Sequence, residues 1–256
     1  MRVCLLASGS KGNSLFVEAD GTRILVDAGL SAREIVRRLA VIGVDPADID
    51  GLFISHEHVD HVRGVGVLAR KYRLPVYVSY PTHRQVLDGV RDAAVIEFES
   101  GYSFGFRDLL IDPFPITHDA CDPVGFTVEC REGKVGVATD LGTATRLVAD
   151  KLKGCRVLVL ESNHDEDMLM GGPYPWHLKQ RIKSRHGHLS NSDSAALLAE
   201  VIHPGLEGLF LAHLSEVNND PAVAKEVTES LLATQAACLP RLIVGDQYSP
   251  SETLTL

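Results

Sequence analysis

The sequence predicts a protein of the α/β class. Apolar runs of strand length alternate with helix patterns along the 256 residues, and no low-complexity segment, long linker or short-period repeat interrupts them. This length is near the upper size for one hydrophobic core. We therefore expect residues 1–256 to form one domain.

Each expected strand is a short apolar run bounded by polar or turn-forming residues. The expected strands are Val3–Ala7, Leu15–Ala19, Arg23–Asp27, Gly51–Ser55, Pro75–Ser79, Val95–Glu97, Leu109–Thr117, Gly125–Cys130, Lys134–Thr139, Val157–Glu161, Leu209–Ala212 and Arg241–Val244. The first helix begins at Ser31, a candidate N-cap with Glu34 at the capping-box position. Its apolar residues Ile35, Leu39 and Ile42 recur on one face. The other expected helices run from about His61 to Tyr72, Thr143 to Leu152, Trp176 to Arg185, Ser192 to Ile202 and Pro221 to Ala236.

The segment Ser55–His61 reads Ser-His-Glu-His-Val-Asp-His and follows an expected strand directly. At a strand end, His56 and His58 point in one direction because strand side chains alternate. Asp60 and His61 then follow on the turn into the next helix. Imidazole nitrogen and carboxylate oxygen suit zinc, manganese or iron, and two such ions roughly 3.5–4 Å apart can clamp the oxygens of a hydrolysis. The alternative is a solvated, histidine-rich loop.

Four other expected strands also lead into acidic or imidazole side chains, at Asp27, His118, Asp140 and His213. Taken singly, each would more often be a helix cap or a hydrogen-bonded turn residue. Taken together with the histidine-rich segment, they indicate one site assembled from strand ends.

This order of motifs resembles that of the metallo-β-lactamase superfamily. The resemblance implies a four-layer αββα sandwich of two αββ halves, and the Asp122-Pro123 step suggests a division near residue 122. It further implies that Asp140 bridges two metals and that Asp27 orients a ligand. The implied ligands are His56, His58 and His118 for the first metal, and Asp60, His61 and His213 for the second.

Further motifs resemble the nucleic-acid-processing branch of the superfamily. Glu161 follows the strand after Asp140, His188 lies in Gly187-His188-Leu189-Ser190-Asn191, and His213 stands in a Leu-x-His-x-Ser context. The resemblance implies that His188 donates a proton to the leaving alkoxide or contacts the scissile phosphate. Glu161 would hold its imidazole, and a carboxylate partner keeps imidazolium available near neutral pH. The alternative for His188 is a neighbour of the cap of the next helix.

Nearly the whole chain is similar to the bacterial WalJ/YycJ-type metallohydrolases. The similarity rests on Ser8–Ser14, Thr117–Ala120, Glu161–Asp165, Tyr174–Trp176 and Gly187–Asn191. It implies a metal-dependent nuclease with exonuclease activity on DNA, with Asp60, His188 and Glu161 as catalytic residues. The glycine- and serine-rich Ser8–Ser14 loop would permit close approach of the backbone to a phosphate or to the metal site; a plain turn is the alternative.

Charge, cysteine content and hydropathy limit the possible partners, metal sites and location of the protein. The net charge of −9 disfavours nonspecific attraction to nucleic acid, so a local basic face is needed. The candidates are Lys179, Arg181, Lys183, Arg185 and His186 before His188, and Arg33, Arg37 and Arg38 on the first helix. Five cysteines without a Cys-x-x-Cys pair argue against disulfides and a thiolate zinc site. The chain shows no secretory h-region and no apolar run of ~18 residues, so we expect a cytoplasmic protein without a membrane partner.

The sequence thus favours a dinuclear phosphodiesterase, namely a nuclease, in which a metal-bridging hydroxide attacks phosphorus. Two divalent ions, zinc or manganese with iron as a further candidate, would be its cofactors, and nucleic acid or another phosphodiester its substrate. One alternative is a small-molecule hydrolase of a cyclic phosphodiester, a thioester or a β-lactam. Another is a catalytically silent scaffold that keeps the fold as a binding module. The sequence leaves open DNA or RNA, the cleavage polarity and the oligomeric state.

Overall fold

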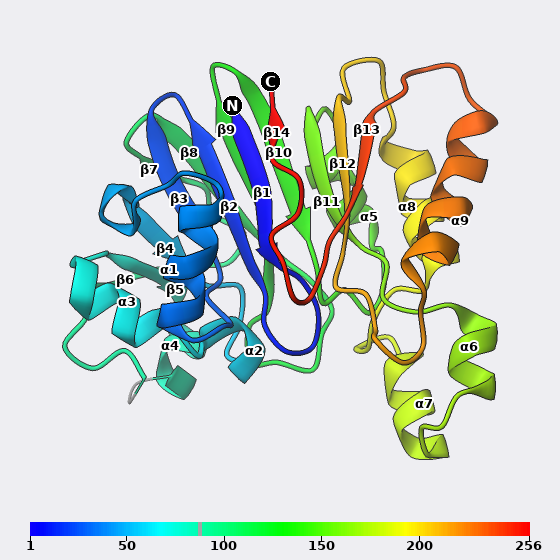
Figure 1. Cartoon of the computed structure of the whole chain (residues 1–256), viewed down its shortest axis with the longest axis horizontal. Coiled ribbons are helices and arrows are strands. Elements are labelled where there is room, and N and C mark those ends of the chain that lie inside the picture. The colour runs from blue at the N-terminus through cyan, green and yellow to red at the C-terminus, as the bar shows by residue number, and fades with distance from the viewer. Residues whose placement is uncertain (87–88) are drawn as a thin grey trace.

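The computed structural model describes residues 1–86 and 89–256, and within them two mixed sheets face each other (Figure 1). The strand order of the first sheet is β14 (Leu254–Thr255), β1 (Arg2–Ala7), β2 (Ser14–Ala19), β3 (Thr22–Val26), β4 (Gly51–Phe53), β5 (Val76–Ser79) and β6 (Val95–Phe98). The order of the second is β13 (Arg241–Val244), β12 (Gly208–Ala212), β11 (Val157–Glu161), β10 (Gly133–Ala138), β9 (Val124–Cys130), β8 (Leu109–Pro115) and β7 (Phe104–Phe106).

Helices cover the outer faces of both sheets, which gives the predicted four-layer αββα sandwich. The helices of the first half are α1 (Ala32–Val41), α2 (Val59–Val62), α3 (Val65–Tyr72) and α4 (Tyr80–Val86), with a 3-10 turn at Pro46–Asp48. Those of the second half are α5 (Arg146–Leu152), α6 (Glu166–Gly171), α7 (Trp176–Ile182), α8 (Asn191–Val201) and α9 (Pro221–Ala233). Among the described residues, no helix is both long and apolar enough to cross a membrane.

The alternation of side chains along β11 shows how one strand serves two cores. Val157 and Val159 lie in the apolar cluster between the sheets, together with Phe53 of the first sheet. Leu158 and Leu160 point the other way, into the cluster beneath α5, α8 and α9. A third cluster, beneath α1 and α3, covers the outer face of the first sheet. These three apolar interfaces are those that a four-layer sandwich requires.

Parallel pairing brings the functional strand ends to one edge of the sandwich. Strands β3 to β6 are parallel to one another, and so are β10 to β13. β8 pairs antiparallel with β9, which pairs antiparallel with β10, so β8 also ends at this edge. The residues after β3, β4, β8, β10 and β12, with the last residue of β11, therefore meet between the two sheets.

Three predicted features differ in the structure. The helix expected from His61 to Tyr72 is two helices, because the Gly64 N–H donates to Ala28 O and the Asp60 carbonyl accepts from Asn13 N. These tertiary bonds replace the helical bond between residues 64 and 60.

The chain changes sheet between β6 and β7, at residues 99–103, whereas the division expected near Asp122 falls between β8 and β9 of one sheet. Pro123 there marks only a loop. The α7 helix ends at Ile182 instead of Arg185, because the Ile182 carbonyl accepts from His188 N. Strands β7 and β14 and helices α4 and α6 were not expected; the strands are very short, and both helices follow neighbouring elements almost directly.

Candidate metal centre

The histidine-rich segment is anchored by a buried carboxylate on the neighbouring strand end. Asp27 follows β3, and its Oδ1 accepts from Ser55 N at 2.8 Å. Its Oδ2 accepts from Ser55 Oγ and from His61 Nδ1, both at 2.7 Å. Ser55 Oγ in turn accepts from His56 Nδ1 at 2.9 Å. Asp27 therefore fixes the rings of two histidines and leaves the Nε2 atom of each turned toward the centre.

The first cluster consists of His56, His58 and His118, whose ligand nitrogens all lie within 4.8 Å of one another. His58 Nδ1 lies 3.1 Å from His56 Nε2 and 3.3 Å from His118 Nε2. His118 Nδ1 donates to Gly187 O at 3.2 Å, which orients its ring. The arrangement matches a three-imidazole site for a divalent metal.

The second cluster consists of Asp60, His61 and His213, again within 4.8 Å of one another. Asp60 Oδ2 lies 3.6 Å from His61 Nε2 and 3.9 Å from His213 Nε2. The three side chains come from the α2 segment and the end of β12, on opposite sheets. A metal held here would join the two halves of the sandwich.

Asp140, two residues beyond the end of β10, lies between the two clusters. Its carboxylate oxygens lie 3.2 Å from His61 Nε2, 3.5 Å from His213 Nε2 and 3.8 Å from His118 Nε2. Asp140 Oδ2 and His213 Nε2 are buried and have no hydrogen-bond partner among the described residues. A bound cation would satisfy both of these buried, unpartnered ligand atoms once the imidazole has lost its proton. The residues present therefore fit a metal site, and Asp140 lies between its two ligand clusters.

The pKa shifts divide the imidazoles into two groups. Burial, reinforced by His61, lowers the pKa of His56, and burial also lowers the pKa of His118, so both rings are neutral near pH 7. Burial opposes the charge on His61, but Asp140 and Asp27 outweigh it and raise the pKa to about 10. The pKa of His213 rises in the same way, with Asp140 again the main opposing charge. Here positive charge is required beside buried carboxylates, and a divalent cation can supply it in place of protons.

Glu161, the last residue of β11, connects the second cluster to His188. Its Oε1 accepts from His188 Nδ1 and from His213 Nδ1, both at 2.8 Å. Its Oε2 accepts from the backbone N–H groups of Leu141 at 2.7 Å and Leu189 at 3.2 Å. Burial alone would raise the pKa of Glu161, but His188 and His213 outweigh burial and lower it to about 2. One carboxylate thus holds two imidazoles, of which the sequence indicated only His188.

Three residues of the site adopt left-handed backbone conformations. The φ angles are 62° at Asp27, 55° at Asp140 and 58° at His213. Non-glycine residues adopt such angles infrequently, and they persist where surrounding contacts determine them. Each residue lies within two residues of a strand end, so the left-handed turn directs the side chain across the sheet edge toward the centre.

The Ser8–Ser14 loop reaches the metal centre through Asn13, which the sequence did not single out. Asn13 Nδ2 lies 3.2 Å from Asp60 Oδ2 and 3.0 Å from His61 Nε2. The Asn13 N–H also donates to Asp60 O at 2.7 Å. A Cβ on Gly29 would lie 1.5 Å from that same Asp60 oxygen, so this close approach requires glycine. The glycine-rich composition of the loop was the available signal.

The two expected basic clusters do not form an open basic face. Arg38 is buried and donates to Glu34, Leu6 O and Gln247 O. Lys179 is also buried, and its Nζ donates to Met170 O and Gly172 O, both at 2.7 Å. Arg181 is exposed and paired with Asp119 through Nε at 2.7 Å. Most of these charges are therefore neutralised or occupied by backbone carbonyls.

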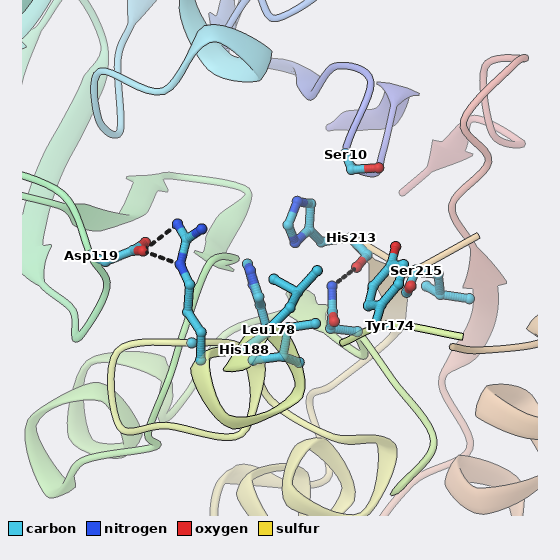
Figure 2. Close-up of a pocket in the computed structure, with 12 residues that line it drawn as sticks. Ser10, Asp119, Tyr174, Leu178, His188, His213 and Ser215 are labelled. Atoms are coloured by element: carbon cyan, nitrogen blue, oxygen red, sulfur yellow. Dashed lines mark hydrogen bonds and ion pairs between the residues drawn. The ribbon is translucent and has the colours of Figure 1, made fainter. Parts of the chain in front are cut away.

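A pocket of about 210 Å³ opens beside the second cluster (Figure 2). His188 and His213 line its centre, and Asp119, the partner of Arg181, lies to one side. Tyr174 and Ser215 lie on the other side. His188 is 22% exposed, whereas its partner Glu161 is fully buried, so the imidazole is the member of the pair that meets solvent.

The fold and the two clusters define a hydrolase of the metallo-β-lactamase fold. A family model described as "Beta-lactamase superfamily domain" matches residues 22–210. The chain is 38% identical over 233 residues to the exodeoxyribonuclease YycJ of Bacillus anthracis, covering 89% of this chain and 88% of that protein. It is 37% identical over 238 residues to the exodeoxyribonuclease WalJ of Streptococcus pneumoniae, with 91% and 87% covered.

Among solved structures, the metallo-β-lactamase fold protein YhfI of Bacillus subtilis superposes with a TM-score of 0.77 at 14% identity, covering 99% of each chain. The protein belongs to the β-lactamase superfamily and, within it, to the WalJ/YycJ-type family. The predicted fold class and family are thereby confirmed.

Proposed function

We propose that this hydrolase is a dinuclear phosphodiesterase that degrades DNA from its ends. The observation that carries the proposal is the pair formed by Glu161 and His188, joined at 2.8 Å and placed beside the two ligand clusters. The names of the YycJ and WalJ relatives, which match about nine-tenths of the chain, support DNA as the substrate and exonucleolytic cleavage as the reaction.

Seven side chains would hold the two metals. The first would be bound by His56, His58 and His118, the second by Asp60, His61 and His213, and Asp140 would contact both. Two divalent ions, zinc or manganese, would supply activated water and neutralise the charge on a phosphodiester.

The chain's own contribution to bond cleavage is the proton on His188. Because the Glu161 carboxylate can only accept hydrogen bonds, it keeps a proton on His188 Nδ1 and directs the ring at the pocket. The N–H group at Nε2 is then the one that would donate a proton to the leaving oxygen. A sugar alkoxide is a poor leaving group unless it is protonated, so a positioned imidazolium accelerates its departure. A lactam-opening enzyme has no evident use for this pair.

A substrate panel tests the proposal. The wild type, reconstituted with zinc or manganese, is assayed on end-labelled single- and double-stranded DNA, matching RNA, bis-p-nitrophenyl phosphate and nitrocefin. We expect kcat/KM for DNA to exceed that for nitrocefin by orders of magnitude, with mononucleotides released from the start of the reaction. Comparable lactam turnover would contradict the phosphodiesterase assignment. Internal cuts without early mononucleotides would contradict the exonuclease assignment.

A further inference from the structure

One wall of the pocket beside His188 is apolar and contributes nothing to metal binding. It consists of Tyr174 and two residues of α7, Leu178 and Ile182. Leu178 and Ile182 are four residues apart, so they share one face of the helix, and all three side chains are half-buried. The same pocket of about 210 Å³ is also lined by the polar side chains of His188 and His213. An amphipathic ligand with a flat apolar part and an anionic part would fit both sides.

Two of the polar side chains that line the pocket are already engaged within the protein. Asn163 Nδ2 donates to His213 O at 2.8 Å, and Arg181 is paired with Asp119. Direct reading of a base edge needs side-chain donors or acceptors that face the base. The apolar wall itself suits a contact with the face of a base, and stacking on an aromatic ring tolerates every base.

The backbone that carries Tyr174 is restricted. This residue lies between Pro173 and Pro175, and a residue that precedes proline is restricted to extended backbone conformations. Pro175 is also the N-cap residue of α7. The buried Lys179 ammonium donates to Met170 O and Gly172 O, which ties the preceding loop to the helix. A restricted backbone reduces the conformational entropy that is lost when a ligand packs against the ring.

The floor of the pocket is joined to the same helix. His188 N donates to Ile182 O at 3.0 Å, directly beyond the end of α7. A Cβ on Gly187 would lie 2.0 Å from that Ile182 oxygen, so glycine is required for the turn. The apolar wall and the proton donor are therefore positioned relative to each other by one short, tight connection.

We propose that this pocket is the subsite for the nucleoside at the DNA end and that Tyr174 is a substrate-binding residue that stacks on its base. The inference rests on the proposed function, and it specifies which part of the DNA substrate binds in the pocket. A volume of about 210 Å³ is below the roughly 300–1,000 Å³ of pockets that enclose drug-sized ligands, so it accommodates one nucleoside and not a run of stacked nucleotides.

The test compares DNA ends that carry a base with ends that carry an abasic analogue at the terminal nucleotide only. In the wild type, loss of the terminal base should raise KM about 5- to 150-fold with little change in kcat, the range that corresponds to base–aromatic stacking. Tyr174→Ala should raise KM similarly on normal ends and no longer distinguish the two substrates. Tyr174→Phe should retain the discrimination, because it keeps the ring.

Trp176→Ala is the matched control. Trp176 is 60% exposed and lines a different hollow, with Met170, Gln180 and Lys183. Its removal should leave both substrates unaffected. If Tyr174→Ala lowers kcat but KM still differs between normal and abasic ends, the residue is structural and the subsite inference is wrong.

A binding measurement separates this inference from the proposed function. Calorimetry with deoxyadenosine monophosphate and deoxyribose 5-phosphate requires no cleavage of DNA. We expect the nucleotide to bind more tightly than the sugar phosphate in the wild type and in Tyr174→Phe, with the difference lost in Tyr174→Ala. If the protein showed this binding difference but did not degrade DNA, the subsite inference would be supported and the proposed nuclease function would be contradicted. Active DNA degradation without any difference between the two ligands would keep the nuclease and refute the subsite.

Discussion

Glu161→Gln is the substitution that most sharply probes how the site is organised. Four donors converge on the Glu161 carboxylate: His188 Nδ1, His213 Nδ1 and the N–H groups of Leu141 and Leu189. Glutamine keeps the shape but replaces one oxygen by an NH₂ group, which donates only. One pair of donors must therefore lose its acceptor in the variant.

The cost depends on which pair the amide faces. If NH₂ faces the histidines, the proton of His213 moves from Nδ1 to Nε2, where the metal would bind. We expect a loss of about 10- to 100-fold in metal affinity, as for other groups that orient a ligand. If NH₂ faces the backbone, the N–H groups of Leu141 and Leu189 are left buried without partners. Each would then lower the free energy of unfolding by roughly 1–3 kcal/mol.

The assay combines a competitive metal titration with urea unfolding of the metal-free protein. The matched control is Glu207→Gln, because Glu207 is 47% exposed and pairs with Arg156 on the surface. That change should alter the unfolding free energy by no more than about 1 kcal/mol and leave metal affinity unchanged. If Glu161→Gln matched this control in both measurements, the argument that Glu161 holds His213 in its metal-binding form would be refuted.

Two further predictions concern metal content and pH. Asp140→Asn removes the charge shared by both clusters. Elemental analysis should therefore find two metals per chain in the reconstituted wild type and fewer in the variant. One metal or none in the wild type would contradict the dinuclear proposal. Arg37, assisted by Arg38 and opposed by burial, lowers the pKa of Glu34 from 4.5 to about 2. The ionised carboxylate therefore stabilises the fold fully above about pH 4.5, and this contribution is lost as the pH falls toward 2. In urea unfolding, the stability difference between wild type and Glu34→Gln should be larger at about pH 6 than at about pH 2.5, and an equal difference would contradict the assignment.

The candidate ligands could be predicted because each follows an apolar run that is recognisable by itself. His118, Asp140 and His213 needed only the inference that strand ends meet at one edge. The contact between Glu161 and His213 was missed because it depends on register: Glu161 pairs with Ala212 across β11 and β12, which places His213 beside it. Local sequence does not specify that pairing.

The missed parts of the fold and site depend on tertiary packing. Lys179 and Arg38 look like exposed basic residues in sequence, yet both are buried with their charges directed at backbone carbonyls. The break between α2 and α3 arises from bonds to Ala28 and Asn13, which are far away in the chain. Tyr174 was noticed only as part of a family motif, because its position in the pocket follows from how α7 packs beside the metal centre.

In the proposed mechanism, His188 supplies a proton and does not bind metal. The most direct test measures kcat of His188→Ala relative to wild type on an oligonucleotide and on a p-nitrophenyl phosphodiester, with metal content determined in the same samples. We predict unchanged metal content and a loss of about 10²–10⁴ in kcat on the oligonucleotide, with a much smaller loss on the nitrophenyl ester, since nitrophenolate leaves without protonation. A parallel loss of metal, or equal losses on both substrates, would contradict the claim.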